Sequence, residues 1–204
     1  MRYSRPGLHD IDRQLEAFLP DRGVFVEAGA NDGYRQSNTY FLERIKGWSG
    51  VLVEPIPALA EDCRRQRARS QVFNCALVED QTASPTVSLR YADLVTSVAH
   101  PERVTNEPLM GWHQSYDVEV PGRTLSSVLD DAGVTHVDFL SLDIEGYEPQ
   151  ALRGLDFGRH APAFMLIEVE GFDPDRLAAV EDTFGDRYEC VARLSSRAAL
   201  YRRR

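Results

Sequence analysis

Cysteine is scarce in this chain, and long apolar runs are missing. The three cysteines, Cys63, Cys75 and Cys190, are odd in number and show no CxxC spacing, which argues against a disulfide framework or a zinc knuckle. No apolar run approaches membrane-spanning length, and Arg5 and Asp10 interrupt the region where a secretory signal needs an apolar core. We therefore expect a cytoplasmic protein that is neither secreted nor inserted into a membrane.

Basic residues are also fewer than acidic ones. Lysine and arginine together number 23, against 32 aspartates and glutamates, which gives a formal net charge of -9. Nucleic-acid phosphates need a basic protein face, so we expect a small-molecule partner and no nucleic acid. The 204 residues, of which 43% are hydrophobic and 27% charged, suit one globular domain, 1–204, with a packed core.

Short, valine-rich apolar runs alternate with longer amphipathic stretches, which is typical of βαβ units around a parallel sheet. The predicted strands are 24–30, 50–54, 71–78, 136–143, 164–170, 188–194 and 198–202. The predicted helices are 37–45, 58–69, 124–132, 149–155 and 174–184, after a leading helix at about 9–20. Only three residues separate the last two strands, so these strands form a hairpin. We predict an α/β, Rossmann-like three-layer sandwich with a seven-stranded, mostly parallel sheet that ends in an antiparallel hairpin.

Prolines and a glycine break this alternation between about 83 and 121. We expect an insertion on the substrate side of the sheet, because loops carry specificity while the sheet supplies rigidity. His113 lies in the insertion and is a candidate catalytic base, with His100 a weaker one. The alternative for both is a solvated loop histidine.

The first predicted strand runs into an E-x-G-x-N-x-G turn formed by Glu27, Gly29, Asn31 and Gly33. Such glycines allow a tight turn and the close backbone approach of a nucleoside. The pattern differs from the GxGxxG that places a pyrophosphate at a helix N-terminus. A nicotinamide-dependent oxidoreductase therefore remains only as an alternative.

Two acids near strand ends are candidate ligands. Burying Glu27 in an apolar strand is costly without a partner, and that partner is either a sulfonium amino acid or an arginine at the sheet edge. Glu54 ends the second strand, about where such folds bind ribose hydroxyls. Its alternative role is a charge at the start of the next helix.

Three ordered stretches, 27–33, 51–55 and 138–148, resemble the FkbM family of S-adenosylmethionine-dependent methyltransferases, which have the class I, Rossmann-like fold. The resemblance implies S-adenosylmethionine as cofactor. It places Glu27, Gly29, Asn31 and Gly33 around the methionine part, Ser37 near the methionine carboxylate, Glu54 at the ribose, and Cys75 and Ala76 at the adenine. For Cys75, simple burial in the core is an equal alternative.

Asp143 ends the fourth predicted strand, where open α/β sheets bind ligands. It is a candidate general base, a cofactor anchor, or a ligand of a divalent metal such as magnesium together with Glu168 or Glu170. In the turn that follows, we expect Glu148 at a capped, solvated helix start, whereas Glu145 points either inward or outward.

The resemblance implies O-methylation of a hydroxyl on a sugar or another small metabolite, in the tailoring of a natural product or a glycan. The sequence also admits N-methylation, or a non-catalytic domain that retains cofactor binding. The stretch that would specify the acceptor, 83–121, carries the least recognisable pattern.

Overall fold

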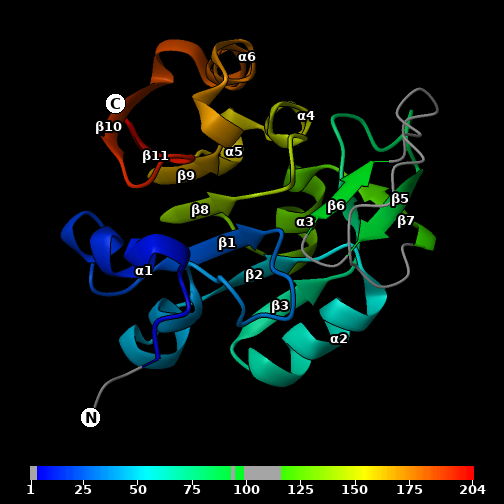
Figure 1. Ribbon diagram of the computed structural model, residues 1–204, viewed down its shortest axis with the longest axis horizontal. Coiled ribbons are helices and arrows are strands. Elements are labelled where there is room, and N and C mark those ends of the chain that lie inside the picture. Colours follow the sequence, from blue (N-terminus) through cyan, green and yellow to red (C-terminus); the bar gives the residue numbers. More distant parts are fainter. Residues whose placement is uncertain (1–3, 93–94, 99–115) are drawn as a thin grey trace.

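The computed structural model describes residues 4–92, 95–98 and 116–204, with the backbone alone at 91–92, 95–98 and 170. A seven-stranded sheet lies at its centre, in the order β10-β11-β9-β8-β1-β2-β3 (Figure 1). Its strands are β1 (Val24–Ala28), β2 (Ser49–Val53), β3 (Ser70–Phe73), β8 (Phe139–Leu142), β9 (Phe164–Glu168), β10 (Tyr188–Arg193) and β11 (Ala198–Arg203). β11 runs opposite to the other six strands of this sheet. The predicted Rossmann-like fold is confirmed.

Helices cover both faces of this sheet. They are α1 (Ile11–Gln14), α2 (Pro57–Gln66), α3 (Leu125–Ala132), α4 (Glu148–Arg153), α5 (Phe157–His160) and α6 (Pro174–Phe184), with short turns η1 (Leu8–Asp10), η2 (Leu15–Ala17), η3 (Leu42–Lys46), η4 (Glu170–Phe172) and η5 (Gly185–Arg187). One buried cluster joins α3, α4 and α6 to the sheet, and a second joins α1, η3 and α2. Strands such as β1 and β8 are buried on both faces, which suits their mainly apolar sequences, although β1 includes Glu27 and β8 includes Ser141.

The predicted strand at 71–78 is wrong as a single element. It divides at Asn74, whose side-chain amide donates to the carbonyl oxygens of Glu54 (2.9 Å) and Pro55 (2.7 Å) and so ties the end of β3 to that of β2. Beyond this point the chain leaves the main sheet. β4 (Ala76–Leu77) pairs instead with a strand of the insertion.

Three strands of the insertion form a small sheet with β4, in the order β4-β7-β5-β6. They are β5 (Thr86–Ala92), β6 (Val95–Val98) and β7 (Tyr116–Arg123), drawn in green beside the main sheet in Figure 1. This sheet has a small hydrophobic cluster of its own, in which Val87, Leu89 and Val120 pack on Ala76 and Val78.

Two predicted helices differ from the structure. The stretch at 37–45 becomes helical only near its end, where η3 is a π-helix, because Ser37 and its neighbours bind a buried acid instead. The leading helix is divided into η1, α1 and η2, and His9 and Asp10 have left-handed backbone angles. None of the helices in the described part of the chain combines the length and the apolar character needed to span a bilayer.

Candidate active site

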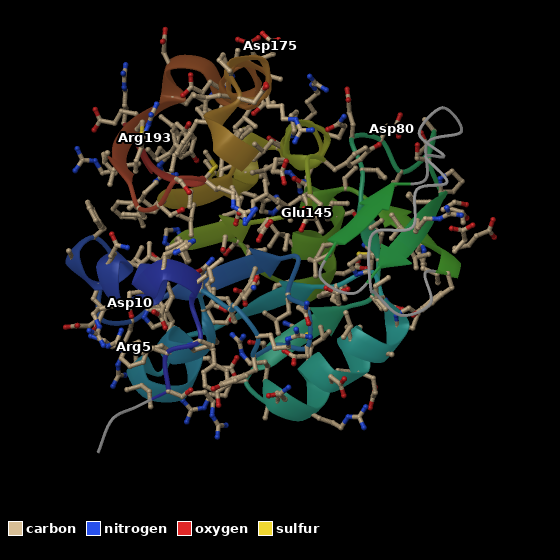
Figure 2. All side chains as sticks on the ribbon, viewed as in Figure 1. Arg5, Asp10, Asp80, Glu145, Asp175 and Arg193 are labelled. Atoms are coloured by element: carbon tan, nitrogen blue, oxygen red, sulfur yellow. The ribbon has the colours of Figure 1, made fainter. Side chains whose placement is uncertain are left out.

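A cavity of about 130 Å³ opens at the carboxyl ends of β1, β2 and β8. Eight of the predicted site residues line it: Glu27, Gly29, Asn31, Ser37, Glu54, Cys75, Ala76 and Asp143. Leu89 also lines it, so the insertion contributes to the wall. Figure 2 labels Glu145, which follows β8 at this edge of the sheet.

Gly29 allows the loop after β1 to touch the loop after β8. Its φ is +82°, and a Cβ there would lie 1.8 Å from the carbonyl oxygen of Asp143. Gly33 has a similar φ of +83° but does not belong to the cavity lining. Its carbonyl oxygen accepts a hydrogen bond from Arg67 at 3.0 Å, so Gly33 shapes the turn from behind the cavity.

The carboxylate of Glu27 is fully engaged by the protein. Its Oε1 accepts from the backbone N–H of Asn38 at 2.8 Å. Its Oε2 accepts from Ser37 Oγ (2.8 Å), Thr39 Oγ1 (2.7 Å) and Arg67 Nη1 (3.3 Å). Of the two partners expected for this acid, the structure supplies the arginine, although it lies in the interior and not at the sheet edge.

Arg67, which the sequence analysis missed, is completely buried beneath this turn. Its guanidinium bonds Glu43 at 2.8 Å and Thr39 at 2.7 Å in addition to Glu27. A buried arginine needs this many acceptors because its charge is costly to remove from water. Nothing in the arginine-rich stretch around it distinguishes this residue, so only the tertiary structure identifies it.

Ser37 is part of the same network. Its hydroxyl donates to Glu27 and accepts from Arg67 Nη1 at 3.1 Å and from the backbone N–H of Tyr40 at 3.0 Å. Its hydroxyl proton is thus already bound within the protein. The predicted contact between Ser37 and a methionine carboxylate gains no support from this geometry.

Glu54 is buried at the end of β2. Its two oxygens accept the backbone N–H groups of Asn31 (2.8 Å) and Ile56 (2.9 Å). Burial raises the pKa of Glu54 to about 7, although both hydrogen bonds act in the opposite direction. The acid therefore connects the turn after β1 with the start of α2.

Cys75 and Ala76 follow Asn74 and form an apolar part of the cavity wall. Burial raises the pKa of Cys75 to about 12, so its thiol stays neutral and unreactive. Small side chains at these positions leave room for a planar ring, and packing accounts for the cysteine equally well.

Asn38 is a second cavity residue that the sequence analysis did not single out. Its Nδ2 donates to Ser141 Oγ on β8 at 3.1 Å. Its Oδ1 is buried and has no hydrogen-bond partner within the described residues. Buried acceptors are usually paired, so this atom at the cavity wall is available to a donor from a bound ligand.

A second cavity, of about 410 Å³, lies between α4, α6 and the ends of β8 and β9. Asp143 and Glu145 line both cavities, so the two adjoin at the end of β8. The remaining charged residues of the second cavity are Glu148, Glu168, Asp175, Arg176 and Arg197. Acids therefore outnumber bases among the charged residues that line it.

Asp143 and Glu168 form a hydrogen-bonded acid pair at this junction. Burial, and then the charge of Glu168, raise the pKa of Asp143 well above its usual range, and Glu145 and Glu148 add to the effect. Glu168 also forms a salt bridge with Arg197, in which Glu168 Oε1 lies 3.2 Å from Arg197 Nε. Asp143 thus holds its proton more tightly than an ordinary aspartate.

Glu148 begins α4 as expected, but it is not solvated. It is buried, and its Oε1 accepts the backbone N–H groups of Ile144 (3.0 Å) and Gly146 (3.1 Å). Burial raises its pKa. The left-handed turn at Glu145 (φ 57°) and Gly146 (φ 93°) directs both N–H groups to this carboxylate, which is the physical reason for the difference.

Several predictions fall on residues that the structure does not describe. His113 and His100 lie outside the described residues, as does the side chain of Glu170. The described residues contain no group of three or more histidine, cysteine or acidic side chains that could hold a metal ion. The magnesium site suggested for Asp143 therefore gains no support.

Solved structures with a similar fold include two methyltransferases. A TehB-like SAM-dependent methyltransferase from Corynebacterium glutamicum is 12% identical, with a TM-score of 0.51 over 95% of this chain and 87% of that chain. Methyltransferase FkbM from Methylobacillus flagellatus is 18% identical, with a TM-score of 0.53 over 91% of this chain but 45% of that chain. At these identities the likeness shows the fold alone.

A protein of the NADB-Rossmann superfamily from Streptococcus agalactiae has the same TM-score of 0.53 at 8% identity, over 100% of this chain and 69% of that chain. The architecture by itself therefore does not separate methyltransferases from nicotinamide enzymes.

A search of curated proteins finds no match. The model of the methyltransferase FkbM domain, in contrast, matches residues 27–194. Since this match includes the glycine turn, Glu54 and Asp143, the chain belongs to the FkbM family of S-adenosylmethionine-dependent methyltransferases.

Proposed function

We propose that this protein transfers a methyl group from S-adenosylmethionine to a hydroxyl of a sugar or another small metabolite. The observation that carries the proposal is the position of Asp143 between two adjoining cavities. One cavity has the features of a nucleoside site, and the other is an adjoining space with several acids in its wall. A buried acid at their junction is placed to receive a proton.

The first cavity fits the methyl donor. Glu54 would accept hydrogen bonds from the ribose hydroxyls, and the apolar wall at Cys75 and Ala76 would contact adenine. The unpaired Oδ1 of Asn38 would gain a donor near the methionine end. When bound, S-adenosylmethionine supplies an electrophilic methyl group whose transfer leaves a neutral thioether.

The second cavity would take the acceptor. Its carboxylates accept hydrogen bonds from hydroxyl groups, which favours a polyhydroxylated molecule. The acidic wall also favours an amine, so N-methylation is the second candidate. Comparing amino-substituted acceptors with matched alcohols separates the two, because methylation of the amine alone would overturn the O-methylation proposal.

Asp143 would act as the general base. In its ionised form it takes the hydroxyl proton while the acceptor oxygen bonds to the methyl carbon. A carboxylate with a raised pKa is a stronger base, at the cost of being protonated at low pH. Turnover should therefore rise with pH through the raised pKa of Asp143.

The first test is calorimetric titration with S-adenosylhomocysteine, with NAD as control ligand and with runs in magnesium and in chelator. Binding of S-adenosylhomocysteine alone is the expected result. Preferential binding of NAD, or no binding of the nucleoside, would overturn the proposal. An affinity that is the same in magnesium and chelator would show that cofactor binding needs no ion.

The role of the base is tested by two substitutions. Asp143→Asn should lower kcat by about 10²- to 10⁴-fold with little change in cofactor affinity. Glu168→Gln removes the neighbouring charge and should move the acid limb of the pH–rate profile to lower pH. Glu189→Gln, which breaks an exposed pair with Arg202, is the control. If Asp143→Asn weakens cofactor binding as much as turnover, Asp143 is a cofactor anchor.

A further inference from the structure

Three side chains at the end of α2 bind three consecutive carbonyl oxygens of the turn after β1. Cys63 Sγ lies 3.0 Å from the oxygen of Asn31, and Gln66 Nε2 lies 2.9 Å from that of Asp32. Arg67 Nη1 lies 3.0 Å from that of Gly33. Each successive carbonyl of the turn thus has its own donor from the same helix end.

The spacing of these donors explains why they act together. Cys63 and Gln66 are positions i and i+3 on one face of α2, and Arg67 is the C-cap residue whose backbone N–H still bonds to the carbonyl oxygen of Cys63. The three side chains therefore leave the same end of the helix. Their targets are adjacent in sequence. We call these three residues the α2 clamp.

The opposite side of the turn belongs to the cavity. Asn31 lines it, and the backbone N–H of Asn31 donates to Glu54, the proposed ribose ligand. This N–H belongs to the peptide that directly precedes the three clamped carbonyls, so Glu54 holds the first peptide of the turn and α2 holds those that follow. The clamp and Glu54 therefore fix the turn from two sides.

We propose that the α2 clamp positions the cofactor-binding turn, so that these residues set affinity for the methyl donor without touching it. Binding is stronger when the protein does not have to order a loop at the moment of association. The inference rests on the proposed function, because the ligand is the proposed donor. Gln66 is the best residue to test, since it is only half-buried and forms a single neutral bond to the turn.

The experiment compares three substitutions at Gln66 by calorimetry with S-adenosylhomocysteine. Gln66→Glu keeps the shape but loses the donor, Gln66→Ala loses the side chain, and Gln66→Lys keeps a donor. The expected order of affinity is wild type and Gln66→Lys, then Gln66→Ala, then Gln66→Glu. Loss of the neutral hydrogen bond should cost about 2- to 10-fold in affinity. Arg65→Ala, one residue earlier on the exposed side of the same helix, is the control.

A second measurement separates positioning from general stability. In Gln66→Ala the KM for S-adenosylmethionine should rise while kcat at saturation stays unchanged, and backbone amides at 31–33 should exchange hydrogen faster without ligand. Unchanged affinity in all three variants, or equal losses in Gln66→Glu and Gln66→Lys, would overturn the clamp. If the wild type itself fails to bind S-adenosylhomocysteine, the proposed function fails instead.

Discussion

At the scale of single residues, this site depends on buried acids in three different environments. Glu27 is paired with a buried arginine and several hydrogen-bond donors. Glu54 has two backbone donors, and burial raises its pKa to about 7. Asp143 is buried and faces other acids, and its pKa lies well above the usual range. In the proposed function, these three acids serve support, ligand binding and proton transfer, respectively.

Affinity for S-adenosylhomocysteine should fall as Glu54 is protonated. If ribose hydroxyls bind the ionised carboxylate, lowering the pH from 8 to 6 across its pKa of about 7 should weaken binding about 10-fold. Glu54→Gln should bind more weakly and lose this pH dependence. Calorimetry at several pH values measures both, and a full pH dependence in Glu54→Gln would assign the titration to another group.

Arg67 should contribute strongly to stability. Arg67→Met leaves Glu27 and Glu43 buried without their cation, so the free energy of unfolding should fall by about 3–5 kcal/mol. The exposed Arg64→Met, which breaks a pair with Glu61, should cost less than about 1 kcal/mol. Urea unfolding measures both values. Similar small losses in the two variants would show that the buried network is replaceable.

At the scale of elements, the site is made where β1 and β8 meet. The strands are hydrogen-bonded in parallel, with Ala28 opposite Leu142, so the loops that follow them emerge side by side. This arrangement brings the glycine turn against Asp143. The small sheet of the insertion adds Leu89, a residue of β5, to the wall of the same cavity.

Gly29→Ala should disrupt this contact. Its Cβ would overlap the carbonyl oxygen of Asp143, and φ is +82°, so strain and overpacking together should destabilise the fold by about 2–5 kcal/mol. Gly133→Ala is the matched control, because its φ is +67° but no atom of the described residues lies within 4 Å of a Cβ there. Thermal unfolding compares the two. Equal losses would show that backbone strain alone matters at Gly29.

At the scale of the whole molecule, buried acids make stability depend on pH. Glu54, Asp143 and Glu148 all have raised pKa values in the fold. Between their ordinary pKa values and the raised ones, the folded state binds more protons than the unfolded state, so the free energy of unfolding falls as pH rises. Exposed acids such as Asp130 and Glu189 have lowered pKa values and act in the opposite sense, but only at lower pH.

We therefore expect the Tm to be highest near pH 5 and to decrease toward pH 8. The net charge of -9 adds repulsion in the same direction. Glu54→Gln should decrease less over this range, because it carries no ionisable group at that position. Calorimetric scans at a series of pH values test this, and a Tm that rises from pH 5 to pH 8 would contradict it.

The sequence by itself determined the order along the chain of the seven strands in the main sheet and the acids near their ends. Apolar periodicity and strand-end position are local properties, and the carboxyl ends of parallel strands must share one edge. For this reason, sequence position alone assigns Glu27, Glu54 and Asp143 to one site. Only the tertiary structure decided the partners of these acids. Arg67 reaches Glu27 across 40 positions of sequence, Asn74 divides a predicted strand, and Glu148 is buried. The pairing of donors with acceptors depends on how segments distant in sequence pack together, and a local sequence pattern does not predict that packing.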